Sequence, residues 1–455
     1  MTKHLLNPAK NIAIVVLAAL SLYQTGRLWF EDGKYPNIPG MFNFGGDFRP
    51  SEAELSALST PARVLKSDGE FPGKFYAAPA PEGSEEKNFL EDCVRKILAE
   101  GGGFSAPAPE TAPGGTARLI FEYGFIMPPD VFALCFSSKS NALASGIQGF
   151  DSVTAKLAGV ETILLTFANS ESGETAAFSI TDESLAGRLS ALASGAGSAG
   201  GFYYVSGKDL GLNQTGKTTF IAAWGENGYD FFSLNVINPY AQNDSPLQSL
   251  VEKKVSVFFD NPSHIWMDVR SDAGIYTFSD ESTVVKYHSN SLLEYSSTKI
   301  NTKAADSFLS AYSAALDMLG RDITIENGFF LSGYDRADGA WIFRFDFTVG
   351  DMPVFFSESA RAELGMDSMI EITVVNDIVT KYRRYVAVLE LDPTYSLSAV
   401  NDFSAAARSV LGSLDELEPE ALTGLELGYR LDGGLQATLF WRISAYGNVY
   451  SVPAE

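Results

Sequence analysis

The feature that most constrains this chain is an apolar run near its N-terminus, at residues 12–23. Read on to Trp29, the segment has about 18 residues, and at 1.5 Å per residue a helix of that length spans about 27 Å, just enough to cross a bilayer core. Lys3 and Lys10 precede the run, which favours a cytoplasmic N-terminus. We therefore predict a cytoplasmic tail at residues 1–10, a transmembrane helix at 11–30 and an extracytoplasmic location for the rest.

Two other interpretations of the apolar run stay open. A cleaved signal peptide is the first, because the strictly apolar core is short. No small-x-small cleavage site follows it, however, since the next residues read YQTGR. The second is a helix of a soluble protein. A mature protein beginning near residue 28 would contradict the membrane anchor.

The charge balance argues against several classes of partner. The 455 residues include 56 acidic and 33 basic side chains, for a formal net charge of −23. Binding to nucleic acid needs concentrated Lys and Arg, and so does binding to an anionic membrane surface. We interpret the negative charge as an aid to solubility.

The few cysteines and histidines argue against a metal site. Cys93 lies in a helical pattern and Cys135 in an apolar run, and we favour two buried free thiols over a disulfide. His4, His264 and His288 do not pair with Cys or with one another at metal-ligand spacing. We expect His264, in an Asn-Pro-Ser-His run, to belong to a turn or helix cap. No cofactor, metal or catalytic residue is predicted.

One motif match is misleading. Residues 211–218, GLNQTGKT, satisfy the phosphate-loop pattern, and VSVFFD at 255–260 imitates its magnesium-binding partner strand. A phosphate loop needs a strand running directly into it and a helix leaving it. Here SGKD intervenes before the motif, and the β-rich TTFIAAW follows. We therefore interpret the motif as a polar turn with Lys217 in solvent.

The rest of the chain predicts an α+β protein with antiparallel sheets and packed helices. We expect a Gly- and Pro-rich linker at 31–60, an α/β domain at 61–200, a β-rich domain at 201–300 and a C-terminal domain at 301–455. The predicted helices are residues 84–99, 182–192, 246–254, 303–319 and 399–414. The predicted strands are residues 118–123, 162–168, 202–205, 218–223, 229–236, 255–259, 274–278 and 283–287.

The C-terminal domain shows an internal repeat. Each of its two long helices precedes a pair of strands, FFLSGYDRADGAWIFRFDF in one case and LELGYRLDGGLQATLFWRI in the other. An Asp-Gly pair, which is typical of a hairpin turn, separates the strands in both. We interpret these as tandem helix-plus-hairpin units, the first extended by strands at 369–391. Phe343, Phe345 and Phe347 alternate as a packed sheet face requires.

Two blocks of short motifs carry a resemblance to a known family. The first is LSLYQTGRLW at 20–29, and the second comprises FFDNPS at 258–263, IYTFSD at 275–280 and LLEY at 292–295. Together with the predicted topology, they resemble the YycH family, the single-pass regulators of the WalK (YycG) sensor histidine kinase in low-GC Gram-positive bacteria. The family has an Asp-Gly turn where this chain has Ser279-Asp280-Glu281.

The resemblance implies that the spanning helix regulates the kinase by contacting its transmembrane helices. It implies a three-part extracytoplasmic region, a YycI-like C-terminal portion, and a WalK-like kinase and a YycI-like sister regulator as partners. The matching positions that we nominate for partner binding are Leu20, Tyr23, Gln24, Arg27 and Trp29. From the residues alone, we favour interfacial anchoring as the role of Gln24 and Arg27. The alternative is contact with another protein's transmembrane helices, where a buried polar side chain can specify a partner.

Three functions remain as hypotheses. The first is a non-enzymatic, single-pass regulator of a sensor kinase that controls cell-wall metabolism. The second is an extracytoplasmic module that senses a small ligand or wall fragment, with the helix as a passive tether. A deep, aromatic-lined pocket between domains would favour it. The third is an enzyme, and unchanged behaviour of a Lys217→Ala variant would exclude its nucleotide-binding version.

Overall fold

The computed structural model has an α+β fold in which two large sheets, mostly antiparallel, carry packed helices. Residues 49–455 form one compact unit. The structure describes residues 52–67, 69, 74–78, 84–100, 104–105, 117–136, 143, 146–194, 202–207, 220–224, 231–242, 245–270, 274–299, 307–322, 325, 327–350, 352–397, 400–411, 422–433, 436–445 and 448–454. The predicted tail, the membrane helix and residues 31–51 of the predicted linker lie outside these residues, whereas residues 52–59 of that linker form a helix.

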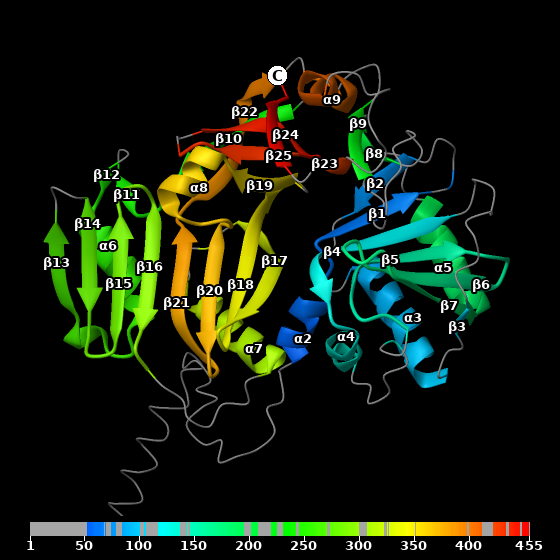
Figure 1. Cartoon of the computed structure of the whole chain (residues 1–455), viewed down its shortest axis with the longest axis horizontal. Coiled ribbons are helices and arrows are strands. Elements are labelled where there is room, and N and C mark those ends of the chain that lie inside the picture. The colour runs from blue at the N-terminus through cyan, green and yellow to red at the C-terminus, as the bar shows by residue number, and fades with distance from the viewer. Residues whose placement is uncertain are drawn as a thin grey trace, which may run out of the picture. The chain divides into compact units, whose positions relative to one another are not determined.

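The first sheet has nine strands in the order β3-β7-β6-β5-β4-β1-β2-β8-β9. Their bounds are β3 Phe104–Ser105, β7 Thr175–Thr181, β6 Thr162–Ala168, β5 Phe150–Leu157, β4 Arg118–Met127, β1 Arg63–Ser67, β2 Lys74–Ala78, β8 Phe202–Ser206 and β9 Phe220–Trp224. Helices α3 (Glu85–Glu100) and α5 (Glu183–Ser194) pack against it, as Figure 1 shows. Two shorter helices, α2 (Glu52–Ser59) and α4 (Pro129–Cys135), contact each other.

The second sheet has 14 strands. Its main order is β13 (Trp266–Arg270), β14 (Ile275–Ser279), β15 (Thr283–His288), β16 (Leu292–Ser297), β21 (Ile378–Tyr385), β20 (Ile370–Val375), β18 (Ala340–Val349), β19 (Met352–Phe356), β23 (Leu422–Leu431), β24 (Gln436–Ala445), β10 (Phe231–Ile237) and β22 (Val388–Leu397). In addition, β17 (Gly328–Ala337) pairs with β18 and β25 (Asn448–Pro453) with β24. Strand β19 runs parallel to β23.

Four further helices accompany the second sheet among the described residues: α6 (Gln248–Val255), α7 (Phe308–Arg321), α8 (Glu358–Leu364) and α9 (Phe403–Leu411). Helix α7 begins where Ser307 accepts a hydrogen bond from the Ser310 backbone N–H, in a reciprocal capping box. Helix α8 ends at Gly365, whose φ of 62° suits glycine. The small pair β11 (Ala241–Gln242) and β12 (Ser245–Pro246) stands apart.

Both predicted strand pairs of the C-terminal region are confirmed as antiparallel pairs in the described residues. Strands β17 and β18 meet at Asp338-Gly339, which have φ of 53° and 77°, as a tight hairpin turn requires. Strands β23 and β24 also pair antiparallel, and the Asp432-Gly433 pair lies between them in the chain. Phe343, Phe345 and Phe347 are all buried in the second sheet. That the two helix-plus-hairpin units are copies of each other stays a prediction.

One predicted strand is wrong. Residues 255–259 are β-branched and aromatic, but the chain there ends α6 and continues as a 3₁₀ turn at Ser256–Phe258. Val251, Val255 and Phe258 are buried and recur at helical spacing, so helical burial overrides local β-propensity. The other predicted helices and strands appear, most of them with shifted ends, and the strand predicted at 162–168 has the predicted bounds. Strands β8 and β9 belong to the first sheet, whereas β13–β16 belong to the second.

Candidate functional site

The residues nominated for partner binding lie outside the described part of the chain. This applies to Leu20, Tyr23, Gln24, Arg27 and Trp29, so their role stays a prediction. Among the helices that the structure describes, none combines the length and apolar character needed to cross a membrane. The GLNQTGKT motif and Lys217 also lie outside the described residues.

The two histidines in the described residues, His264 and His288, occupy structural positions, and His4 lies outside these residues. His264 ends the 3₁₀ turn Pro262–His264, and the side chain of Asn261 accepts a hydrogen bond from the Ser263 backbone N–H at 3.1 Å. The predicted turn or cap is therefore confirmed. His288 Nε2 lies 2.9 Å from Glu294 Oε2, beside Arg383. The hydrogen bond from His288 is the main cause that lowers the pKa of Glu294.

The cysteines are unsuited to chemistry. Cys93 is buried in α3 and Cys135 is half-buried in α4, and both are free thiols. Burial raises the pKa of each thiol to about 12, so the reactive thiolate is not formed near neutral pH. Within the described ranges, no group of three or more His, Cys, Asp or Glu side chains is arranged to hold a metal ion.

The second block of motifs that carry the family resemblance, at 258–263, 275–280 and 292–295, comes together at one end of the second sheet, whereas the first block, at 20–29, lies outside the described residues. Phe258 packs against Tyr295, with ring centroids 6.2 Å apart. Asp280, in the turn that departs from the Asp-Gly pattern, accepts hydrogen bonds from the backbone N–H groups of Ser282 and Thr283. A side chain thus closes this turn between β14 and β15 in place of a glycine conformation.

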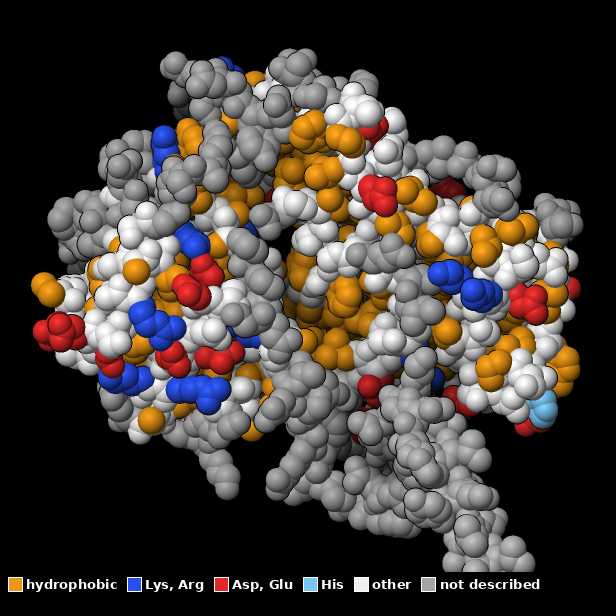
Figure 2. Space-filling view, turned by 180° about the vertical axis from the view of Figure 1, so that it is seen from behind, with side chains coloured by type: hydrophobic (Ala, Val, Ile, Leu, Met, Phe, Trp, Pro, Cys, Tyr) orange, Lys and Arg blue, Asp and Glu red, His pale blue; other side chains and the backbone are white. Residues whose placement is uncertain are grey.

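A cleft of about 820 Å³ between the two sheets is the best candidate for a binding site. The first sheet lines it with the end of β4, the start of β5 and the turn after β6. The second sheet contributes β17, β18, β19, α8, β23, β24 and β25. Figure 2 shows a hollow in the middle of one face, with hydrophobic side chains in its wall. The volume suits a small organic ligand.

The end of β4 joins the two walls of this cleft. Here β4 leaves its pairing with β5 and packs against β17 instead. The Tyr334 hydroxyl donates a hydrogen bond of 3.3 Å to the Ile126 carbonyl, and its ring meets Phe125 edge to face. Gly124 lies directly against β17, where a Cβ atom would come within 2.7 Å of the Phe330 ring and clash with the Leu331 carbonyl.

Gly124→Ala is expected to destabilise the protein by about 1–3 kcal/mol, because β4 and β17 must separate to admit a methyl group next to a backbone carbonyl. Urea unfolding measures the change. Gly333→Ala is the matched control, since a Cβ atom at that cleft position meets no atom within 4 Å. Equal stability of the two variants would contradict the close approach of the strands.

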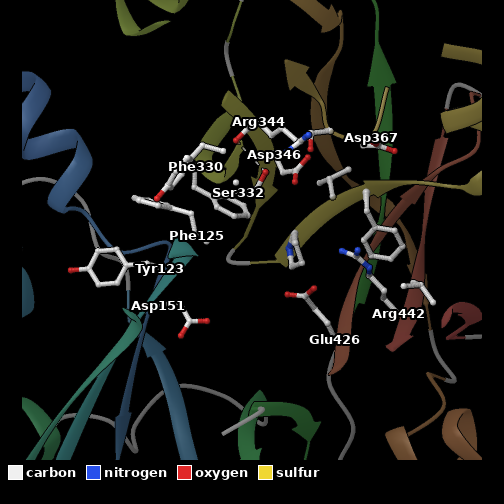
Figure 3. Close-up of a pocket in the computed structure, with 18 of the residues that line it drawn as sticks. Tyr123, Phe125, Asp151, Phe330, Ser332, Arg344, Asp346, Asp367, Glu426 and Arg442 are labelled. Atoms are coloured by element: carbon white, nitrogen blue, oxygen red, sulfur yellow. Dashed lines mark hydrogen bonds between the residues drawn. The ribbon is translucent and has the colours of Figure 1, made fainter. Parts of the chain in front are cut away.

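Charged side chains surround the cleft. Figure 3 shows Ser332, Arg344 and Asp346 from β17 and β18, Glu426 and Arg442 from β23 and β24, and Asp151 from the first sheet. The charged residues that line it are Asp151, Glu171, Asp335, Arg344, Asp346, Arg361, Asp367, Glu426 and Arg442. Arg344 and Asp335 form an ion pair with N–O distance 2.6 Å.

Asp346 is the cleft carboxyl with a shifted pKa. Burial raises its pKa above the ordinary 3.8, although a hydrogen bond from Ser332 and another from the Met369 backbone N–H oppose the change. Arg442 also favours its ionised form, whereas Glu426 opposes it. The folded protein therefore holds this proton at pH values where the unfolded chain has released it.

Asp346→Asn is expected to remove a pH-dependent loss of stability. Because the folded pKa is raised, the contribution of Asp346 is fully present below about pH 4 and is lost as the pH rises through the folded pKa. The asparagine variant should therefore gain stability relative to the parent over that window, measured by urea unfolding at a series of pH values. Asp367→Asn, at an exposed cleft position, is the control. Parallel curves for parent and Asp346→Asn would contradict the assignment.

A second contact connects the cleft to the first described helix. Tyr123 lines the cleft, and its hydroxyl donates a hydrogen bond of 3.2 Å to the carbonyl of Ser59, the last residue of α2. The Lys87 ammonium group, on a side chain that is only 2% exposed, donates to the Ser56 carbonyl and hydroxyl and to the Thr60 hydroxyl. Hydrogen bonds from side chains of α3 and β4 thus fix helix α2 in place.

The sequence alone did not identify the cleft. Its walls come from three widely separated parts of the chain, 123–171, 330–368 and 426–451. No local motif marks them. The available signal was a glycine inside an apolar strand, at Gly124, together with arginines in strands that otherwise alternate apolar residues.

The comparisons identify a fold. No protein-family model matches the chain, and no significant match occurs among curated proteins. The structure is similar to the crystal structure of YycH from Bacillus subtilis, with a TM-score of 0.52 and 11% sequence identity. The alignment covers 90% of this chain and 98% of that one. The chain therefore has a YycH-like fold.

Proposed function

We propose that this chain is a non-enzymatic, membrane-anchored regulator of a two-component sensor histidine kinase that controls cell-wall metabolism. The observation that carries the proposal is the fold shared with YycH over almost the full length of both chains. The regulatory contact runs through the helix at 11–30, in which Leu20, Tyr23, Gln24, Arg27 and Trp29 face the kinase's transmembrane helices. A bias on the kinase requires that these contacts differ between its two signalling states.

In this proposal the N-terminus is cytoplasmic and the bulk of the chain is extracytoplasmic. The extracytoplasmic region has three parts, and the C-terminal one is YycI-like. A YycI-like sister protein acts as a second partner. The order of charges and apolar residues in the first thirty positions supports this orientation.

The anchor-swap experiment tests the helix mechanism. Residues 1–30 fused to an unrelated exterior domain are expected to alter the output of a WalK-like kinase, whereas the native exterior on an unrelated anchor is expected to lose that effect. Photocrosslinking from Gln24 and Arg27 should trap the kinase, with an N-terminal tail position as the control. An effect that follows the exterior domain alone would exclude the helix mechanism.

A second candidate function is supported by the cleft. In this alternative, the chain is an extracytoplasmic binding module, and the helix is a passive tether. The supporting observation is an 820 Å³ cavity between the sheets with Phe125, Phe330 and Phe355 among its lining residues. Gly333→Trp should fill it, because that position has open space around it. Small molecules recovered with the full-length protein should be absent from this variant.

A further inference from the structure

The cleft has walls of different charge. All three of its arginines, Arg344, Arg361 and Arg442, come from the second sheet and its helix α8. Among the described residues, the first sheet contributes two carboxylates, Asp151 and Glu171, and no cation. A ligand that crosses the cleft therefore meets cations on one side only.

Two of the three arginines are available for a ligand. Arg344 is paired with Asp335. Arg361 and Arg442 have no ion pair or side-chain hydrogen bond within the described residues, and Arg361 Nε is buried without an acceptor. A ligand oxygen, which is about the size of a water, can reach only the outer Nη groups of the two arginines, which are not among the buried atoms. The forked donors of a guanidinium group match a carboxylate or a phosphate.

The remaining lining restricts which anion fits. Six carboxyl groups line the cleft: Asp151, Glu171, Asp335, Asp346, Asp367 and Glu426. They would repel a multiply charged anion such as phosphate, since like charges at close range are unfavourable at partly buried sites. The same groups accept hydrogen bonds from an ammonium group or amide N–H groups. The guanidinium of Arg442 lies 5.8 Å from the Phe355 ring, so an apolar surface adjoins this cation.

We propose that the cleft binds a short zwitterionic peptide, with its free carboxylate at Arg361 and Arg442 and its ammonium group towards Asp151 and Glu171. The backbone N–H groups of the peptide face Glu426 and Asp346, and its apolar side chains lie on the phenylalanines of the cleft. The volume of about 820 Å³ limits the ligand to a few residues. This inference rests on the second candidate function.

The test uses the full-length chain in detergent micelles and three equimolar tripeptide mixtures: free at both termini, amidated at the carboxyl end, and acetylated at the amino end. Equilibrium dialysis with mass spectrometry measures the bound fraction. We expect retention of the free peptides at least tenfold above that of either blocked mixture. Equal retention of the amidated mixture overturns the proposal. Equal retention of the acetylated mixture also overturns it, because it assigns the site to the carboxyl end of a longer chain.

Variants locate the binding. Arg361→Gln and Arg442→Gln should each abolish the preference for a free carboxylate, whereas Arg270→Gln, at an exposed position on β13, should leave it unchanged. Arg361→Lys keeps the positive charge but loses the paired N–H donors of the guanidinium group, so it should weaken the preference only in part. A partial effect would show that the loss in Arg361→Gln is not caused by misfolding. Unchanged preference in both cleft variants overturns the proposal. If all three mixtures bind equally and Gly333→Trp blocks that binding, the peptide assignment is overturned, but the binding function stands. The anchor-swap assay reads kinase regulation separately.

Discussion

Asp322→Ala is expected to lower the free energy of unfolding by about 3–5 kcal/mol, because it removes the carboxylate that neutralises a buried arginine. The side chains of Arg384 and Asp322 are 0% and 1% exposed, and Arg384 Nη1 lies 2.7 Å from Asp322 Oδ2. The Tyr382 hydroxyl donates to the same oxygen at 2.8 Å. Burial alone would lower the pKa of Arg384, but Asp322 keeps it above its ordinary value. Urea unfolding measures the loss.

Two comparisons sharpen this expectation. The double variant Asp322→Leu/Arg384→Met removes both charges and should recover most of the stability, because the pair's main cost is desolvation. Asp260→Ala removes a carboxylate that pairs with Lys299 at the surface and should cost less than about 1 kcal/mol. A loss at Asp322 no larger than that at Asp260 would show that the buried pair is not a stability determinant.

Trp441→Ala is expected to cost a similar amount, about 3–5 kcal/mol, through the loss of a large buried side chain. Trp441 is fully buried on β24, and its indole N–H donates a hydrogen bond of 2.9 Å to the Asn401 carbonyl. Its ring stacks on Trp224 of β9, with centroids 6.4 Å apart. Because β9 belongs to the first sheet and β24 to the second, the substitution should also loosen the contact between the sheets.

The matched control is the other member of the stack. Trp224 is half-buried, so Trp224→Ala should cost clearly less than Trp441→Ala while removing the same ring contact. Urea unfolding gives the two stabilities, and near-ultraviolet circular dichroism reports the loss of the stacked pair. Equal losses in the two variants would show that the shared ring contact, rather than burial, dominates.

Much of the local structure could be predicted because its causes are local. The alternation of Phe343, Phe345 and Phe347 follows from the period of a strand, and Asp338-Gly339 adopts the positive φ angles that its residue types permit. The strand prediction for residues 255–259 was wrong because the cause of the structure there lies outside the segment. Its burial is set by Val251, which precedes it on the same helical face.

The candidate site could not be predicted, because tertiary contacts create it. Glu426 and Arg442 are opposite each other across β23 and β24, which a hairpin prediction includes. Nothing in that hairpin indicates that Tyr123 and Asp151 of the other sheet complete the same cavity. Gly124 shows the difficulty, since its lack of a side chain matters only because Leu331 approaches it from more than two hundred positions away.

The attachment of α2 has a mechanical consequence. Lys87 ties Ser56 and Thr60 to α3, and Tyr123 ties Ser59 to β4, so the helix cannot slide or unwind without breaking several hydrogen bonds together. A force applied to the chain before residue 52 would therefore act directly on these hydrogen bonds. One of the load-carrying side chains, Tyr123, also forms part of the cleft wall. Tension on the N-terminal side and occupancy of the cavity would thus act on the same tyrosine.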